Sequence, residues 1–117
     1  MDLSALTDRI QRHNPFVTTV AVFEADGRVE AQSANPSWVA GATALLAPLR
    51  ELLDRTGAEL GCGALASTLV QGRDASIALA DVDGLRTAVV VGNTDAPAGA
   101  LLSDARWLAR EIVEAGQ

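Results

Sequence analysis

The pattern of apolar and polar residues along the chain predicts three helices and five strands. Apolar residues recur at helical spacing from Leu3 to Ile10. We expect this first helix to begin at a cap on Asp2 or Ser4 and to end near His13. The other expected elements, in chain order, are strands at 16–23 and 29–33, a helix at 36–56, strands at 64–71, 75–82 and 85–91, and a helix after the loop 93–97.

Two of the expected strands, 16–23 and 85–91, are apolar at nearly every position instead of at every second one. Such strands are typical of the interior of a sheet that is covered on both faces. Short turns rich in glycine and aspartate separate neighbouring strands, which favours antiparallel pairing. We therefore expect an antiparallel sheet between helices, in a single domain that spans residues 1–117.

The second helix has a clear start signal, an expected kink and an expected end. Asn35 can accept hydrogen bonds from free backbone amides, and Pro36 suits the first helical position. Pro48 removes a backbone hydrogen bond inside the helix, so we expect a kink between Ala44 and Pro48. Gly57 is expected to end the helix.

The second helix also carries more apolar surface than one sheet face requires. Its segment 36–49 has no charged residue, and five apolar residues are expected along one stripe: Trp38, Ala42, Leu45, Leu49 and Leu52. One interpretation is a helix buried deeply in the core. The other is that one side of the helix contacts the sheet while another contacts a second protein chain. We favour the second interpretation and expect this stripe at an interface.

The strand expected at 64–71 contains neither a charged residue nor a proline, the features that usually protect a sheet edge against pairing. If it lies at an edge, it predicts a partner strand, with contacts from Leu65, Ser67, Thr68 and Leu69. Together with the apolar helix, this strand favours a homodimer whose sheet continues across the two-fold axis.

Composition and charge narrow the choice of partners. The nine basic residues are all arginine, and with fifteen acidic residues they give a net charge of -6. Because such a surface repels phosphate, we expect neither nucleic acid nor a membrane as a partner. The chain starts without the pattern of a secretory signal, and no segment is apolar enough to span a bilayer, so we expect a cytoplasmic protein.

Candidate reactive residues have simpler structural explanations. The absence of lysine excludes a P-loop and Schiff-base chemistry. His13 fits a helix end, and Cys62 is expected to be a small apolar packing residue, because its flanking residues include no cation that would make it a nucleophile. Turn and capping roles explain four acidic residues near strand ends better than a metal site does: Asp74, Asp81, Asp83 and Asp95. We expect no catalytic residue, no cofactor and no metal, and we therefore expect that the protein is not an enzyme.

The order of elements, the long second helix and the passage 89–109 resemble the Roadblock/dynein light chain family. In that passage a strand ends in a polar loop, Gly99 stands just inside the last helix, and small residues and arginines follow. Segments 76–79 and 82–84 match the preceding hairpin of the family. The resemblance implies an α+β fold in which a five-stranded antiparallel sheet, in the order 2-1-5-4-3, carries the first and last helices on one face and the long helix on the other.

The resemblance also implies a function. By this resemblance, the chain is similar to proteins that form non-catalytic homodimers or heterodimers through the third strand and the second helix. It is similar in particular to bacterial proteins that regulate or scaffold Ras-like small GTPases. We therefore expect a dimeric bacterial adaptor for such a GTPase. A small-molecule sensor with a pocket between the second helix and the sheet is the alternative.

Overall fold

Five antiparallel strands form one sheet in the order β2-β1-β5-β4-β3, which confirms the order implied by the resemblance. The structure is a computed structural model that describes residues 2–33 and 37–116, with side chains described from residue 42 onward in the second helix. Its elements, in chain order, are α1 (Leu3–His13), β1 (Val17–Phe23), β2 (Val29–Gln32), α2 (Ser37–Glu59), β3 (Ser67–Gln71), β4 (Ala75–Asp81), β5 (Thr87–Asn93) and α3 (Ala98–Glu114).

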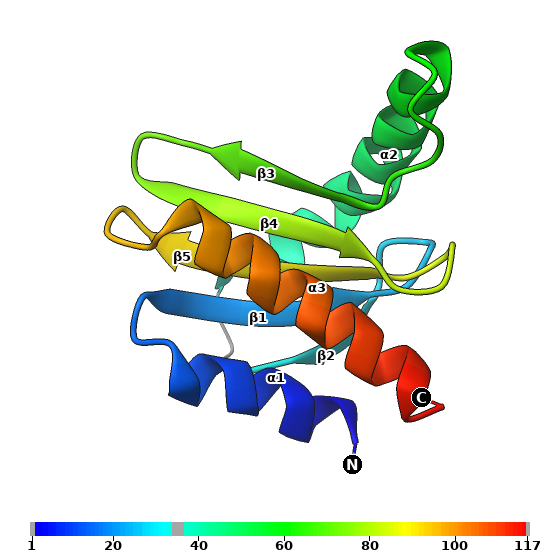
Figure 1. Cartoon of the computed structure of the whole chain (residues 1–117). Coiled ribbons are helices and arrows are strands. Elements are labelled where there is room, and N and C mark those ends of the chain that lie inside the picture. The colour runs from blue at the N-terminus through cyan, green and yellow to red at the C-terminus, as the bar shows by residue number, and fades with distance from the viewer. Residues whose placement is uncertain (1, 34–36, 117) are drawn as a thin grey trace.

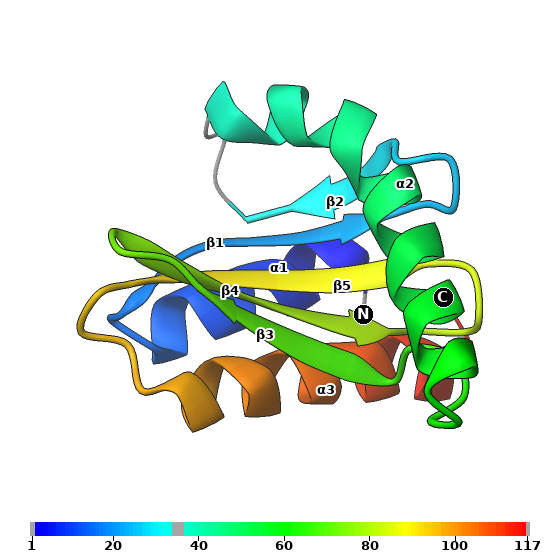
Figure 2. The same ribbon diagram turned by 90° about the horizontal axis from the view of Figure 1, so that it is seen from above.

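Helices cover both faces of the sheet, as the α+β expectation requires. Helices α1 and α3 lie on one face and α2 lies on the other (Figure 1, Figure 2). The larger core lies between the sheet and α1 and α3, where Val20, Val22 and Val90 are fully buried. A smaller core lies under α2 and consists of Ala21, Phe23, Leu46, Leu79 and Val89.

The two continuously apolar strands occupy the interior of the sheet, as predicted. Strand β1 pairs with β2 and β5, and β5 pairs with β1 and β4. Every residue of β1 except Thr18 is buried. Strand β5 begins two residues later than expected, because the Asp83 carboxylate accepts hydrogen bonds from the backbone amides of Leu85, at 3.2 Å, and Arg86, at 2.9 Å. These bonds keep both residues in the turn.

The predicted end of α2 at Gly57 is wrong. The helix continues through this residue to Glu59, and the turn that follows contains Gly61, whose φ is +76°. A Cβ on Gly57 would lie 2.2 Å from the carbonyl oxygen of Gly63, so this glycine allows the returning loop to pass close to the helix. Strand β3 also begins later than expected, at Ser67, because residues 64–66 belong to this returning segment.

The course of α2 agrees with a proline kink. Figure 2 shows α2 changing direction about halfway along its length, and Pro48 lies inside the helix. Proline cannot donate the backbone hydrogen bond that a straight helix needs at this position. The expected start signal, Asn35 and Pro36, lies outside the described residues.

Candidate protein-interaction surface

Helix α2 is attached to the sheet less extensively than the other two helices. Three residues of α1 and five residues of α3 are buried. Among the described side chains of α2, only Leu46 is buried, at 6% exposure. Since burial of apolar side chains is the main source of tertiary stability, α2 needs other contacts to hold its position.

One such contact is the close approach of α2 to the turn between β1 and β2. Gly27 in this turn has a φ of +92°, a conformation that favours glycine. A Cβ at this position would lie 2.3 Å from the carbonyl oxygen of Thr43 in α2. Glycine therefore permits both the turn and the packing of the first half of α2 beside it.

The second contact is a polar network around Arg50, just after Pro48. The Arg50 side chain is 11% exposed. Its Nη1 donates to the carbonyl oxygen of Arg86 at 3.1 Å and to Oγ1 of Thr87 at 3.0 Å, and its Nη2 donates to the Asp81 carboxylate. Its Nε donates to Asp54 one turn further along α2, at 3.2 Å. These charge-assisted bonds connect the second half of α2 to β4 and β5.

Asp54 extends this network to the chain that follows α2. Its Oδ1 accepts a hydrogen bond from the backbone amide of Leu65 at 2.8 Å. Leu65 is half-buried and lies two residues before β3. The network therefore fixes both the direction of α2 and the point where the chain returns to the sheet.

The residues of the predicted stripe on α2 do not all face the same way: some face the smaller core and others face solvent. Ala42 and Leu49 pack against the smaller core, whereas Leu45 and Leu52 are 66% and 56% exposed. The side chain of Trp38 lies outside the described residues. The exposure of Leu45 and Leu52 contradicts the interpretation of α2 as a wholly buried core helix. Their role at an interface stays a prediction.

Strand β3 lies at an edge of the sheet, where β4 is its neighbour. Thr68 pairs with Leu79 of the smaller core, so its side chain is on the α2 face. Ser67 and Leu69 are on the opposite face, where Leu69 packs against the larger core. Leu65, the fourth residue expected to contact a partner, lies before the strand. The four residues are all half-buried, but they do not share one face of the sheet.

Sequence reasoning missed an apolar row on the α2 face of this edge. The row consists of Val70, Ile77 and Val91, which are direct neighbours in the registers of β3, β4 and β5. Val70 is 49% exposed, and Ile77 and Val91 are partly buried. Side chains alternate between the two faces of a strand, so Val70 lies on the same face as Thr68. This alternation is the sequence signal that could have identified the apolar row.

The residues considered for chemistry have structural roles or lie at the surface. Asp81 binds Arg50 and the backbone amide of Gly84, and hydrogen bonds from the backbone of Arg86 lower the pKa of Asp83. Cys62 is exposed in the turn after α2, so its expected packing role is wrong. Within residues 2–33 and 37–116, no cluster of histidine, cysteine, aspartate and glutamate could hold a metal ion. No described helix is long and apolar enough to cross a membrane.

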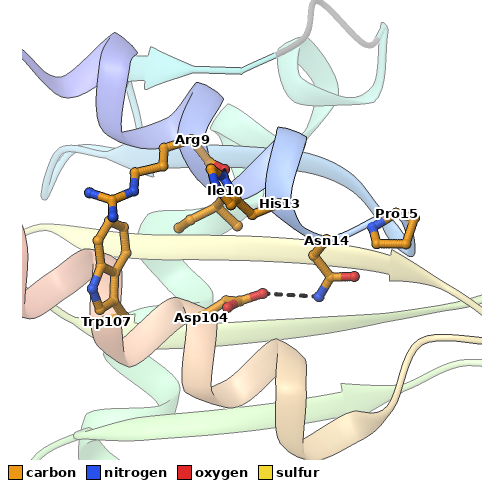
Figure 3. Close-up of a pocket in the computed structure, with 7 residues that line it drawn as sticks. All are labelled: Arg9, Ile10, His13, Asn14, Pro15, Asp104 and Trp107. Atoms are coloured by element: carbon orange, nitrogen blue, oxygen red, sulfur yellow. Dashed lines mark hydrogen bonds between the residues drawn. The ribbon is translucent and has the colours of Figure 1, made fainter.

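Two hollows in the described part of the chain differ from the pocket that a small-molecule sensor would need between α2 and the sheet. A hollow of about 370 Å³ adjoins α2, but of its three charged lining residues Arg50 and Asp54 are bonded to each other and Glu51 is paired with Arg55. A groove of about 360 Å³ lies between α1 and α3, on the opposite face of the sheet from α2 (Figure 3). Neither hollow lies between α2 and the face of the sheet.

In the α1–α3 groove, the polar groups are occupied by contacts with one another. The Arg9 guanidinium lies 5.2 Å from the ring centre of Trp107, and the Asn14 amide donates to the Asp104 carboxylate at 3.1 Å (Figure 3). Nδ1 of His13 lies 2.8 Å from the carbonyl oxygen of Arg9, at the end of α1 as expected. The contacts of Arg9 with Trp107 and of Asn14 with Asp104 connect α1 with α3, and together with the His13 contact they leave few groups to orient a ligand.

The arrangement of sheet and helices is the Roadblock fold. No protein-family model and no curated protein matches the sequence. Among solved structures, a Roadblock/LC7 domain from Streptomyces avermitilis has a TM-score of 0.85 and 19% identity, covering 98% of each chain. Myxococcus xanthus MglB has a TM-score of 0.87 and 13% identity, covering 97% of this chain and 94% of that one. These similarities confirm the fold implied by the sequence resemblance.

The same three-layer arrangement is found in profilin II from Acanthamoeba castellanii. That structure has a TM-score of 0.71 and 18% identity, covering 99% of this chain and all of the profilin. Because a shared fold does not define a shared function, the surface of this chain has to carry the functional argument.

Proposed function

We propose that this protein is a non-catalytic Roadblock-type regulator that forms a homodimer through α2 and β3 and binds a Ras-like small GTPase in the bacterial cytoplasm. The observation that carries the proposal is the exposed apolar side of α2, formed by Leu45 and Leu52, on a helix that buries a single described side chain. A helix of this kind gains stability when a second chain covers it.

The α2 face of the sheet supports a two-fold interface. The apolar row ends at Val70 on the unpaired edge strand β3, on the same face as α2. Burying a leucine that is exposed in one chain stabilises an assembly by roughly 1.5 to 3 kcal/mol before the costs of association. A two-fold axis doubles each such contribution, and antiparallel pairing of two β3 strands satisfies the edge amides and carbonyls.

The proposed GTPase partner rests on the fold and on the family resemblance. MglB and MglC from Myxococcus xanthus share the fold, and another similar structure is described as MglB in a tetrameric arrangement. We assign contact with the GTPase to the paired α2 helices, with Trp38, Leu45 and Leu52 as the proposed contacts. Large apolar residues of this kind dominate the energy of most interfaces. Leu49, which the sequence also suggested, packs against the smaller core and is not one of these contacts.

Binding assays with purified Ras-like GTPases from the same genome test the proposal. Each GTPase is loaded with GDP or a non-hydrolysable GTP analogue and is passed over immobilised protein. We expect one of them to bind in a nucleotide-dependent way. Replacing Leu45→Glu and Leu52→Glu together should weaken this binding at least about tenfold, because the charges would be buried at the interface.

Val113→Glu is the matched control for these variants. Val113 is an apolar residue of α3 with 52% exposure, on the other face of the sheet. It should leave GTPase binding unchanged. The proposal is contradicted when no GTPase of the genome binds in either nucleotide state, or when Val113→Glu weakens binding as much as the α2 variants do.

A further inference from the structure

The arginines of this acidic protein are distributed unequally over its surface. The four that form ion pairs lie on α2 or on turns beside it: Arg28, Arg50, Arg55 and Arg86. Within the residues that the structure describes, the remaining five form no ion pair, and four of them lie on α1 and α3: Arg9, Arg12, Arg106 and Arg110. The α1 and α3 side of the sheet therefore holds four arginines without an ion-pair partner. Among the described residues, five acidic residues without one lie on the same two helices or at the start of α1: Asp2, Asp8, Asp104, Glu111 and Glu114.

Two of these arginines lie one turn apart on α3 and line two adjoining hollows, one of which is also lined by Asp81 and Glu114. Arg106 and Arg110 lie beside the other hollow, of about 400 Å³, whose further lining residues are Gly99, Leu102 and Ser103. None of these five residues is acidic. The hollow therefore combines two guanidinium groups, a hydroxyl group and the partly buried side chain of Leu102.

Arg106 is held in place by its neighbour in the sheet. Its Nε donates to Oγ of Ser67, at the start of β3, at 3.0 Å. In the described part of the chain, its two terminal amino groups and the whole guanidinium of Arg110 have no further partner. An arginine with a fixed side chain and free terminal donors is well suited to a carboxylate, which it can bind through two parallel hydrogen bonds.

We propose that the hollow beside Arg106 and Arg110 binds an acidic segment of a partner protein. Carboxylates of that segment pair with the two guanidinium groups, and an apolar side chain contacts Leu102. The net charge of -6 repels an extended polyanion such as nucleic acid or a membrane surface, whereas a short acidic segment contacts only this patch. The acidic residues Asp81 and Glu114 line an adjoining hollow, so the segment lies towards Gly99.

This site lies on the face of the sheet opposite the α2 surface proposed for dimerisation and GTPase binding, although Arg106 is bonded to Ser67 of the edge strand β3. Helix α3 lies on the face of the sheet opposite α2 (Figure 2). A second partner can therefore bind here while the α2 face is covered. The inference goes beyond the proposed function and does not depend on it.

Fluorescence anisotropy with a defined peptide tests this inference. The probe is a short fluorescein-labelled peptide of glutamate with interspersed leucine, and its counterpart has glutamine in place of glutamate. We expect the glutamate peptide to bind more tightly than the glutamine peptide, with an affinity that falls as salt is added. Arg106→Glu and Arg110→Glu should each weaken binding of the glutamate peptide at least about fivefold.

Arg12→Glu is the matched control, because Arg12 is an exposed arginine of α1 without an ion pair among the described residues and the charge change is the same. It should change the affinity less than about twofold. Circular dichroism of each variant establishes that it is folded, and Arg110→Gln provides a variant without charge reversal. Absence of peptide binding, equal weakening by Arg12→Glu, or equally tight binding of a single-stranded DNA oligonucleotide would overturn the inference.

Discussion

The two faces of the sheet are covered in different ways. On one face, α1 and α3 bury eight residues between them and enclose the larger core. On the other face, α2 is the longest helix of the protein, yet Leu46 is its only buried side chain among those described. Polar bonds of Arg50 and a close approach at Gly27 hold α2 where apolar packing is sparse. One face is thus completed within the chain, while the other leaves Leu45 and Leu52 exposed, where we propose that a partner binds.

The largest expected effect is on the free energy of unfolding, when one buried leucine is removed from each face of the sheet. Leu108 of α3 is fully buried in the larger core, whereas Leu46 belongs to the smaller core under α2. Leu108→Ala should lower the free energy of unfolding by about 3 kcal/mol, and Leu46→Ala by about half as much, since a sparsely packed site loses fewer contacts. Urea unfolding at a low protein concentration measures both. A larger loss for Leu46→Ala would contradict the contrast between the faces.

The next effect concerns the polar attachment of α2. Arg50→Ala removes the cation from the half-buried carboxylate of Asp81 and should lower the free energy of unfolding by about 2 kcal/mol. Arg55→Ala is the matched control on the same helix, because the ion pair of Arg55 with Glu51 is exposed on both sides. It should cost less than about 0.5 kcal/mol. Equal costs for the two variants would show that the Arg50 network does not hold α2.

The sequence predicted most of the fold because local signals and tertiary structure agree there. Asp2 caps α1 by accepting a bond from the amide of Ala5, and the continuously apolar segments became the interior strands β1 and β5. The signals failed where a distant segment decides the outcome. Gly57 did not end α2. Glycine is needed there because a Cβ would collide with the carbonyl oxygen of Gly63 in the returning loop.

The surface proposed for interaction stays a prediction, and the sequence indicated its geometry only in outline. The excess of apolar residues on α2 and the lack of protection on β3 were visible in the sequence, but the division of the stripe depends on how α2 sits on the sheet. Leu49 packs inward and Leu52 outward, although they are only three positions apart. The bonds of Arg50 join residues more than thirty positions apart in the chain, and no local pattern indicates them.

The smallest expected effect is a pH dependence in the turn that supports Arg50. Hydrogen bonds from the backbone of Arg86 hold the pKa of Asp83 below 3.8, the usual value for aspartate. A carboxylate with a lowered pKa in the folded state adds stability above that usual value, and the gain is lost as pH falls through the folded pKa. Asp83→Asn should therefore lower the Tm slightly at neutral pH.

The difference in Tm between wild type and Asp83→Asn should shrink as pH falls below 3.8. Thermal unfolding followed by circular dichroism over a pH series checks this. A constant or growing difference at acidic pH would mean that the charge of Asp83 does not stabilise the turn.

Sedimentation equilibrium of the purified wild-type chain at micromolar concentration tests most directly whether the α2 side is completed by a second copy. The expected mass is twice the 12.1 kDa of one chain, and it should fall to that of a single chain when Leu45→Glu and Leu52→Glu are introduced together. A wild-type mass of 12.1 kDa across the concentration range, or a dimer that both substitutions leave intact, would contradict the account.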